Sequence, residues 1–250
     1  MRASVLVVGV GGLGSPAALY LAAAGVGKIR LVDFDSVAAS NLHRQILFGT
    51  RDIGRAKVEA GAERLGQLNP DASIEAVSAR FDASNARALV RDADVVLDGS
   101  DNFATRYLAN DACVLERVPL VHGGVVNFRG QVMSIAPGRS ACLRCVFPEP
   151  PRVEEVPSCQ QAGVLGAEAG IIGSLMAHEA LKLLLGIGEP LFDTLVIFDG
   201  RRSDFRQARV RRDSACAVCG ADPVIATLQP ESSGAPCSQD FVADTIEALS

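Results

Sequence analysis

The sequence predicts an α/β protein with a doubly wound, mainly parallel sheet that carries helices on both faces. Short apolar runs alternate with longer helical patterns through the first half of the 250-residue chain, and parallel strands need such helices as crossover connections. The first apolar run leads directly into a glycine-rich turn, which is typical of this fold class. Later strand-like runs lack the regular crossovers, so antiparallel strands are expected to extend the sheet.

The first three elements form a strand–helix–strand unit. Residues 4–8 are almost entirely apolar and end at Gly9, as in a parallel strand that is buried on both faces. Residues 16–24 are mostly small and apolar, and they predict a helix that ends near Gly25. Residues 28–32 predict the next strand. A unit of this length joins two parallel strands through one crossover helix.

The same alternation continues after a polar, irregular segment at residues 35–54. A helix over residues 55–68 is expected to stop at Asn69, because the residue before a proline is biased away from helical geometry. Further strands are expected at residues 73–77, 94–97 and 120–121, and further helices at residues 86–92 and 104–116.

The pattern changes in the second half of the chain. Strands are expected at residues 128–135 and 194–198, with a weaker third at residues 207–210. Residues 148–157 are rich in proline and acidic side chains, which predicts a loop, and residues 168–185 predict a long helix with a largely apolar face. These strands are expected to form the antiparallel extension of the sheet.

A length of 250 residues is compatible with one large α/β domain. Residues 230–238 are rich in Pro, Ser and Gly, as in a linker, and residues 240–249 could form a short amphipathic helix. The net charge of -5 argues against nucleic-acid binding through a broad basic surface. No apolar run is long enough for a membrane helix, and no signal peptide is evident, so a cytoplasmic location is expected.

The glycine-rich turn matches the pattern G-x-G-x-x-G at Gly9, Gly11 and Gly14. Glycines allow the backbone to turn sharply between strand and helix and to lie close to a nucleotide. Asp33 ends the second predicted strand, where a carboxylate can accept hydrogen bonds from both ribose hydroxyls. The turn therefore predicts nucleotide binding, but neither it nor Gly12 separates NAD from ATP.

Four polar motifs follow the predicted strands in a fixed order. They are Asp33-Phe34-Asp35, Ser40-Asn41-Leu42-His43-Arg44-Gln45, Gly54-Arg55-Ala56-Lys57 and Ser100-Asp101-Asn102. In this order they resemble the MoeB/ThiF family, whose adenylate-forming core is shared with ubiquitin-activating enzymes. The resemblance runs from about residue 4 to residue 220, which is nearly the whole chain. It implies one adenylyltransferase domain over residues 1–220 and a tail, partly a linker, over residues 221–250.

The resemblance implies an ATP-dependent adenylyltransferase. Its substrate would be the C-terminal glycine carboxylate of a small ubiquitin-like sulfur-carrier protein of the MoaD or ThiS type, which ends in Gly-Gly. Pyrophosphate would be released, and the acyl adenylate would be a step in sulfur transfer to a cofactor, tRNA or metabolite. The resemblance also implies a homodimer, with a separate sulfur donor such as a cysteine desulfurase or rhodanese.

Catalytic roles are implied for Arg44, Lys57, Asp101 and Cys159. Arg44 offers a planar cation that suits phosphate oxygens, and Lys57 lies near a helix start, where the helix dipole also favours anions. Asp101 is a hard oxygen ligand that could hold Mg²⁺ on the phosphates. The ATP-binding residues that the resemblance implies are Gly12, Asp33, Asp35, Ser40, Asn41, Leu42, His43, Arg44, Gln45, Lys57, Asp101 and Asn102.

Four of the seven cysteines form two C-x-x-C pairs, Cys142 with Cys145 and Cys216 with Cys219. Each pair can offer two thiolates to one metal ion, and two such pairs predict a structural Zn²⁺ site with four cysteine ligands. Zinc-bearing family members have the same pattern. Redox chemistry is the alternative, but neither pair begins a thioredoxin-like helix.

The other cysteines and the histidines carry weaker signals. Cys159 follows the proline-rich loop, where a thiolate could attack an acyl adenylate, although a loop cysteine without an essential role is an equal alternative. Cys113 is expected in the core and Cys237 in the linker. None of the three histidines has metal-ligand spacing, and none is assigned a catalytic role.

Three alternatives to the adenylyltransferase interpretation remain open. An NAD-dependent oxidoreductase would explain the glycine turn and Asp33 but would leave the cations and the cysteine pairs unused. A catalytically silent scaffold that binds a ubiquitin-like partner is compatible with the short segment before the first strand. A relative that adenylates a carboxylate on a tRNA base fits less well with the acidic charge balance.

Overall fold

The computed structural model describes residues 2–150 and 163–229 and contains one eight-stranded sheet. The strand order is β3-β2-β1-β4-β5-β6-β7-β8. The strands are β1 (Ser4–Val8), β2 (Lys28–Val32), β3 (Ser73–Val77), β4 (Val95–Asp98), β5 (Leu120–Val126), β6 (Arg129–Ile135), β7 (Thr194–Asp199) and β8 (Asp204–Arg209). The helices are α1 (Gly14–Ala23), α2 (Lys57–Leu68), α3 (Ala86–Arg91), α4 (Phe103–Glu116), α5 (Leu143–Val146) and α7 (Gly166–Leu185), with short 3₁₀ turns η1 (Ala39–Asn41) and η2 (Thr50–Asp52).

The sheet has a parallel half and an antiparallel half, as the sequence predicts. Strands β1 to β5 pair in parallel, and the pairs β5–β6, β6–β7 and β7–β8 are antiparallel. Residues 7 and 8 of β1 lie beside residues 31 and 32 of β2 and residues 97 and 98 of β4. Several strands therefore end at the same edge, where binding sites of doubly wound sheets form.

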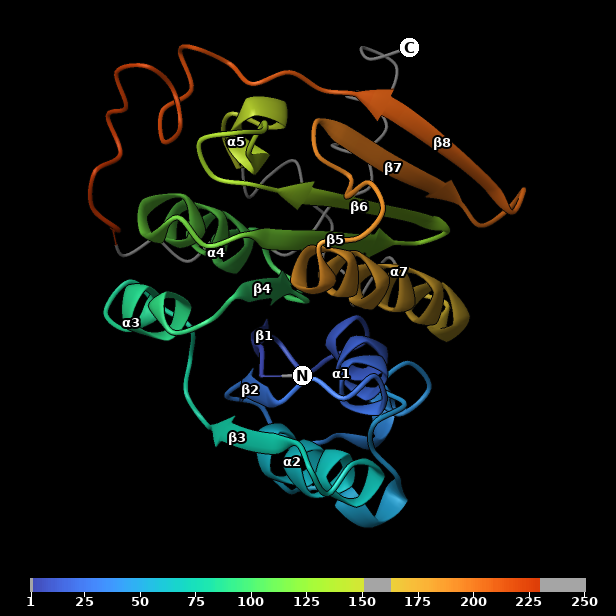
Figure 1. Cartoon of the computed structure of the whole chain (residues 1–250). Coiled ribbons are helices and arrows are strands. Elements are labelled where there is room, and N and C mark those ends of the chain that lie inside the picture. The colour runs from blue at the N-terminus through green and yellow to red at the C-terminus, as the bar shows by residue number, and fades with distance from the viewer. Residues whose placement is uncertain (1, 151–162, 230–250) are drawn as a thin grey trace.

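Helices cover both faces of the sheet (Figure 1). Helices α1, α2 and α7 lie on one face and α3, α4 and α5 on the other. Each face has its own apolar cluster, one built around Leu21, Leu65 and Met176 and the other around Val90 and Tyr107. Burial of these side chains is the main driving force for packing the helices onto the sheet.

Three elements differ most from the sequence-based expectation. Strand β5 extends to Val126, well beyond the expected residues 120–121, because it pairs with β6 along its whole length. Strand β8 begins at Asp204 rather than at residue 207, since it pairs with all of β7. Helix α5 lies between Cys142 and Phe147 and was not predicted, because four residues are too few to show a helical period.

Helix α7 approaches the sheet closely at two glycines. A β-carbon at Gly123 would lie 2.2 Å from the sulfur of Met176, and one at Gly130 would lie 2.4 Å from Ile172. Both neighbours are side chains of α7, so any larger residue on these strands would push the helix outward. This contact places the first turn of α7 beside the glycine-rich turn, where Ala169 lies next to Gly12.

None of the helices within residues 2–150 and 163–229 has the length and apolar character needed to cross a membrane.

Candidate active site

A cavity of about 590 Å³ opens at the carboxyl ends of the parallel strands. This volume lies within the range of about 300–1,000 Å³ that small-molecule sites occupy. The predicted ATP-binding residues that line it are Gly12, Asp33, Asp35, Ser40, Asn41, His43, Arg44, Gln45, Lys57, Asp101 and Asn102. Leu42 is placed differently, because its side chain packs against the apolar cluster beneath α1 and α2.

The glycine-rich turn forms the floor of the cavity. Gly9 has a φ of +84°, a conformation that residues with a β-carbon rarely adopt. A β-carbon at Gly14 would lie 2.0 Å from the carbonyl oxygen of Gly9, so only glycine allows the helix to start this close to the strand. The turn thus leaves room for a ligand against the backbone, as a nucleotide phosphate requires.

Asp33 is fixed by the backbone around it. Its Oδ2 accepts a hydrogen bond from Val10 N at 2.8 Å, and its Oδ1 accepts one from Asp35 N at 2.9 Å. Burial raises the pKa of Asp33, although the positive charge of Lys57 and the two backbone hydrogen bonds oppose the rise. The carboxylate is oriented for an acceptor role at the end of β2, as its position in the sequence suggested.

Lys57 is the first residue of α2 and is 4% exposed. Its Nζ lies 2.9 Å from Asp35 Oδ2 and 3.9 Å from Asp33 Oδ2. Two carboxylates therefore hold the ammonium group at the cavity wall, which offsets the cost of burying the charge. The motif D-x-D serves in part to position this lysine.

Arg44 crosses the cavity next to the glycine-rich turn. Its Nη2 donates to Asn41 Oδ1 at 3.1 Å, and its Nη1 lies 3.3 Å from His43 Nε2. The aliphatic part of Arg44 lies beside Gly12, at a distance of 3.5 Å from where a β-carbon of that residue would be. Gln45 is 3% exposed, and its Oε1 has no partner among the described residues, which leaves it available to a ligand.

Asp101 and Asn102 lie between β4 and α4. Asn102 is the cap of α4, because its Oδ1 accepts a hydrogen bond from Thr105 N at 2.9 Å. Asp101 is exposed at the cavity, next to the capping residue. An exposed carboxylate facing the space where phosphates would lie fits the role of a Mg²⁺ ligand.

Phe34, Arg80 and Arg106 are cavity residues that the sequence analysis did not single out as ligand-binding. The guanidinium of Arg80 lies 4.1 Å from the ring centre of Phe34, and both side chains line the cavity. Arg106 also lines it from the first turn of α4, and its Nη2 donates to the carbonyl oxygen of Ser100 at 3.3 Å. Two sequence signals could have indicated the two arginines. Arg80 follows β3, and Arg106 lies one helical turn after Asn102.

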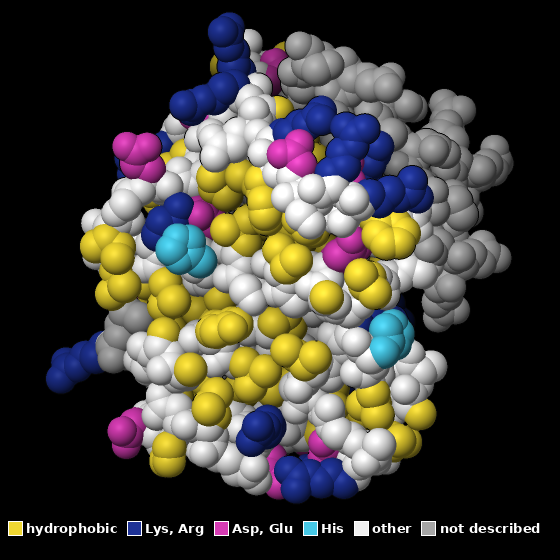
Figure 2. All heavy atoms as spheres, turned by 90° about the vertical axis from the view of Figure 1, so that its right-hand side faces the viewer, with side chains coloured by type: hydrophobic (Ala, Val, Ile, Leu, Met, Phe, Trp, Pro, Cys, Tyr) yellow, Lys and Arg dark blue, Asp and Glu magenta, His cyan; other side chains and the backbone are white. Residues whose placement is uncertain are grey.

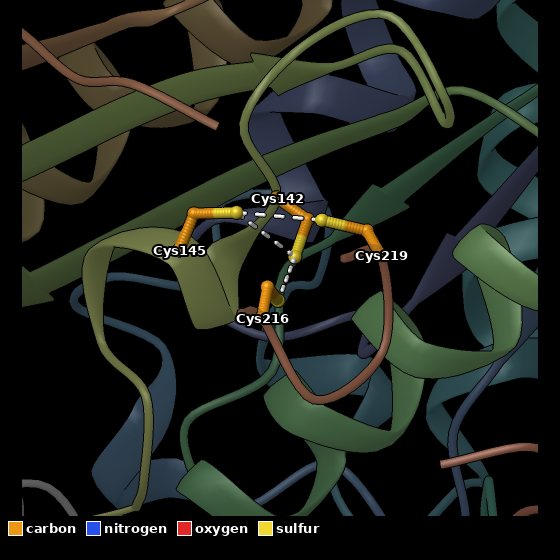
Figure 3. A group of neighbouring side chains, drawn as sticks. All are labelled: Cys142, Cys145, Cys216 and Cys219. Carbon is orange, nitrogen blue, oxygen red and sulfur yellow. Dashed lines mark hydrogen bonds between the residues drawn. The ribbon is translucent and has the colours of Figure 1, made fainter. Parts of the chain in front are cut away.

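The two C-x-x-C pairs meet in one cluster, as predicted (Figure 3). The sulfur atoms lie within 4.8 Å of one another, with neighbouring distances of 3.3, 3.7 and 3.9 Å. A tetrahedral zinc site with Zn–S bonds of about 2.3 Å separates its sulfur atoms by about 3.8 Å. The donor set and its spacing therefore fit Zn²⁺.

The cysteine cluster is tied to the parts of the chain around it. The backbone N–H of Asp213 donates to Cys145 Sγ at 3.4 Å, which is typical of the hydrogen bonds that orient metal-binding thiolates. Arg144, within the first pair, makes a bidentate contact with Asp111 of α4 at 2.7 and 2.8 Å. The cluster thus joins the segment after β8 to α5 and α4.

Of the three remaining cysteines, the structure describes one. Cys113 is fully buried on α4, which confirms the expected core position. Cys159 and Cys237 lie outside the described residues, as do the expected loop beyond residue 150, the linker and the last helix.

The doubly wound sheet, the glycine-rich turn and the cationic cavity beside it define a nucleotide-binding α/β protein with a cysteine cluster at its antiparallel end. The chain belongs to the ThiF family, which it matches over residues 1–218. This membership confirms the resemblance that the four polar motifs indicated.

Named relatives agree with this assignment. The chain is 49% identical over 227 residues to the sulfur carrier protein adenylyltransferase of Thermus thermophilus, covering 89% of this chain and 84% of the relative. It is 47% identical over 220 residues to the SAMP-activating enzyme E1 of Haloferax volcanii, covering 88% and 81%. It is 48% identical over 228 residues to the adenylyltransferase and sulfurtransferase MOCS3-1 of Drosophila pseudoobscura pseudoobscura, covering 91% of this chain but only 51%, about half, of that protein.

Solved structures confirm the fold. Escherichia coli MccB with ATP superimposes with a TM-score of 0.77 at 24% identity, covering 87% of this chain and 67% of MccB. At this identity the likeness concerns the fold alone. The relatives in sequence are named as adenylyltransferases, which confirms the expected enzyme class and leaves the NAD-dependent alternative without support.

Proposed function

We propose that this protein adenylates the C-terminal glycine carboxylate of a small ubiquitin-like sulfur-carrier protein of the MoaD or ThiS type. The observation that carries the proposal is the cavity itself, where Arg44, Lys57 and Asp101 surround the glycine-rich turn. Two cations suit a triphosphate, and the carboxylate suits its metal ion. The names of the relatives support the same reaction.

In this reaction Asp33 holds the ribose, because its oriented carboxylate can accept from both hydroxyl groups. Arg44 and Lys57 stabilise the charge that develops on the α-phosphate when the carrier carboxylate attacks and pyrophosphate leaves. Mg²⁺, held by Asp101, would neutralise phosphate charge when it is bound. The side-chain amides of Asn41 and Gln45 orient phosphate oxygens by neutral hydrogen bonds.

The carrier tail would enter the cavity between β5 and α7. Val125, Gly163 and Val164 line the cavity there, and Asn127 N donates to the carbonyl oxygen of Gly163 at 3.3 Å. These residues present backbone and small apolar surface but no charge. A tail that ends in Gly-Gly suits such a passage, because it has no side chains to accommodate.

We also propose roles for the cysteines. Cys142, Cys145, Cys216 and Cys219 bind a structural Zn²⁺, which the sulfur spacing supports. Cys159, outside the described residues, is the candidate nucleophile for the acyl adenylate. A separate donor, such as a cysteine desulfurase or rhodanese, would supply the sulfur, and the reaction would take place in the cytoplasm.

A homodimer is proposed from the surface of α1 and α7. Hydrophobic side chains gather on this face of the molecule (Figure 2). Both helices are apolar on nearly every side, and Tyr20, Ile171 and Leu185 are between 41% and 57% exposed. Helices that are apolar all round are normally buried, and a second copy of the chain would bury these.

Carrier-dependent exchange of labelled pyrophosphate into ATP tests the reaction. A panel of purified small carriers that end in Gly-Gly is offered to the wild-type protein and to Asp101→Ala. Exchange with one carrier that the variant abolishes would support the proposal and identify the partner. ATP binding without exchange would favour the catalytically silent scaffold, and no ATP binding would contradict the proposal.

A further inference from the structure

Three neighbouring strands contribute to a chain of buried polar side chains behind the cavity. Asp98 ends β4, His122 lies beside it on β5, and Gln131 lies on β6. His122 Nδ1 lies 2.8 Å from Asp98 Oδ2, and His122 Nε2 lies 3.2 Å from Gln131 Nε2. All three side chains are at most 5% exposed. Burial of so many polar groups costs free energy, so their contacts must serve the structure around them.

This network of buried polar side chains continues into the loop that carries Asp101. Asp98 Oδ1 accepts hydrogen bonds from Ser100 N at 3.1 Å and Ser100 Oγ at 2.6 Å. The carbonyl oxygen of Ser100 in turn accepts from Arg106 Nη2 at 3.3 Å. Asp98 therefore fixes the turn immediately before Asp101, while the Asn102 cap fixes the residue immediately after it.

Gly124 lies next to the far end of this network of polar side chains. A β-carbon there would lie 3.4 Å from Gln131 Nε2 and 3.5 Å from Arg106 Nη1. The amide and the guanidinium thus share the space above this glycine. Arg106 lines the cavity, so the same network touches the site at two points, the Asp101 loop and Arg106.

The contacts favour one tautomer of the imidazole. Gln131 Nε2 is an amide donor, so His122 Nε2 accepts its hydrogen bond and Nδ1 carries the hydrogen that is donated to Asp98. Asp98 accepts hydrogen bonds from His122 Nδ1, Ser100 N and Ser100 Oγ, all of which favour the charged form of its carboxyl group. The carboxylate is thus charged, and His122 holds one of its two oxygens.

We infer that His122, oriented by Gln131, is a positioning residue that fixes Asp98 and thereby places Asp101 and Arg106 at the cavity. The inference rests on the proposed adenylylation for its kinetic test, but not for its spectroscopic test. His122 does not touch the cavity. Its effect passes through Asp98 and Ser100, and it acts on geometry, which governs rates in sites that work by orientation.

The kinetic test compares His122→Leu, which removes the donor, with His122→Asn, which can keep an N–H near the Nδ1 position. His122→Leu is expected to lower kcat of carrier-dependent exchange about 10–100-fold, and to raise KM for the Mg²⁺ complex of ATP because Asp101 loses its fixed position. His122→Asn is expected to restore most of the rate. Asp98→Asn, in which the side chain keeps nearly the same shape, serves as a second variant if His122→Leu does not fold. Its loss of kcat is expected to be smaller than that of His122→Leu.

Ser134→Ala is the matched control. Ser134 lies on the same strand as Gln131 and is fully buried, and its Oγ donates to Glu179 Oε2 at 2.9 Å, outside the network. It should lose stability without a loss of kcat per folded molecule. The inference would be overturned if folded His122→Leu had the kcat of the wild type. It would also be overturned if the activity of His122→Leu fell only in proportion to its folded fraction, as expected for the control.

Nitrogen-15 spectra of the histidines give a readout that needs no carrier. The His122 signals, assigned by their loss in His122→Asn, should show a protonated Nδ1 and an unprotonated Nε2. Mg²⁺-dependent ATP binding should weaken in His122→Leu, while binding without Mg²⁺ persists. A proton on Nε2 alone, or unchanged Mg²⁺ dependence, would overturn the inference even if no carrier supports exchange.

Discussion

At the scale of single residues, the site is built from side chains that hold one another in place. Lys57 is held by Asp35 and Asp33, and Arg44 by Asn41. Such contacts reduce the reorganisation needed when a charged ligand binds, which is a main source of catalytic power in sites of this kind. Lys57 also remains close to two compensating carboxylates when no ligand is present.

Lys57→Ala should lower the rate of carrier-dependent pyrophosphate exchange by about 10²–10³-fold, because one preorganised cation is lost from the transition state. Lys28→Ala is the control, since Lys28 pairs with Glu75 at the exposed start of β2. Steady-state exchange assays measure both variants. Equal effects in the two variants would contradict the assignment of Lys57.

Asp33 predicts a pH dependence of ATP binding. Because burial raises its pKa, Asp33 takes up a proton at a higher pH than an exposed aspartate. A protonated carboxyl is a poorer acceptor for the ribose hydroxyls, so ATP affinity should fall as the pH is lowered from neutrality into the mildly acidic range. Titration calorimetry at several pH values measures this.

The control for this pH effect is Asp33→Asn, which has no carboxyl group to titrate. It should bind ATP weakly and lack the part of the pH dependence that belongs to Asp33. The same pH profile in wild type and variant would assign the effect to other groups, such as the phosphates of ATP.

At the scale of elements, the cysteine cluster joins two segments that no strand pairing connects. Helix α5 and the segment at residues 216–219 meet only near the four sulfurs, and α5 is tied to α4 through Arg144 and Asp111. Helix α4 in turn starts directly after Asp101. A metal at the cluster therefore stabilises the element that borders the site, although it lies outside the cavity.

Removal of the metal should lower the melting temperature. A cross-link that closes a long loop contributes about 2–5 kcal/mol, which corresponds to roughly 4–20 °C for a domain of this size. Purified protein is treated with a zinc chelator and followed by calorimetry, with metal content measured in parallel. Cys142→Ser should show a similar loss, and Cys113→Ser, outside the cluster, should not release metal.

Much of the fold could be predicted because hydrophobic periodicity is a local property. Strand β1 and helix α7 follow directly from it, whereas the length of β5 does not, because His122, Gly123 and Gly124 interrupt its apolar run. The motifs predicted which side chains meet at the cavity, but His122 and its partners Asp98 and Gln131 are neighbours only in space. No spacing in the sequence indicates such contacts.

At the scale of the whole molecule, the face formed by α1 and α7 determines the expected assembly. The two helices pack against each other on one side of the sheet, and exposed apolar side chains lie along both (Figure 2). In a symmetric pair the same face of each copy would be covered. Both cavities would then belong to one rigid assembly.

Tyr20→Asp should weaken this pair, raising the dimer dissociation constant at least about 10-fold, because a charge would be buried at the centre of an apolar contact. Val224→Asp is the control, since Val224 is 83% exposed and lies outside both helices. Sedimentation equilibrium measures both variants. Dissociation constants that match the wild type for Tyr20→Asp would place the interface elsewhere or argue against a dimer.

The wide separation of the two cysteine pairs along the chain has a consequence for biosynthesis. Cys142 and Cys145 leave the ribosome long before Cys216 and Cys219, and the strands of the parallel half precede both pairs. Since chains begin to fold from the N-terminus during translation, the nucleotide-binding half can assemble while the metal ligands are still incomplete. The proposed binding of zinc would then be a late step of maturation. In a cell short of zinc, we expect newly made chains to accumulate with a formed ATP cavity and an unsecured C-terminal sheet, and proteases to attack them there first.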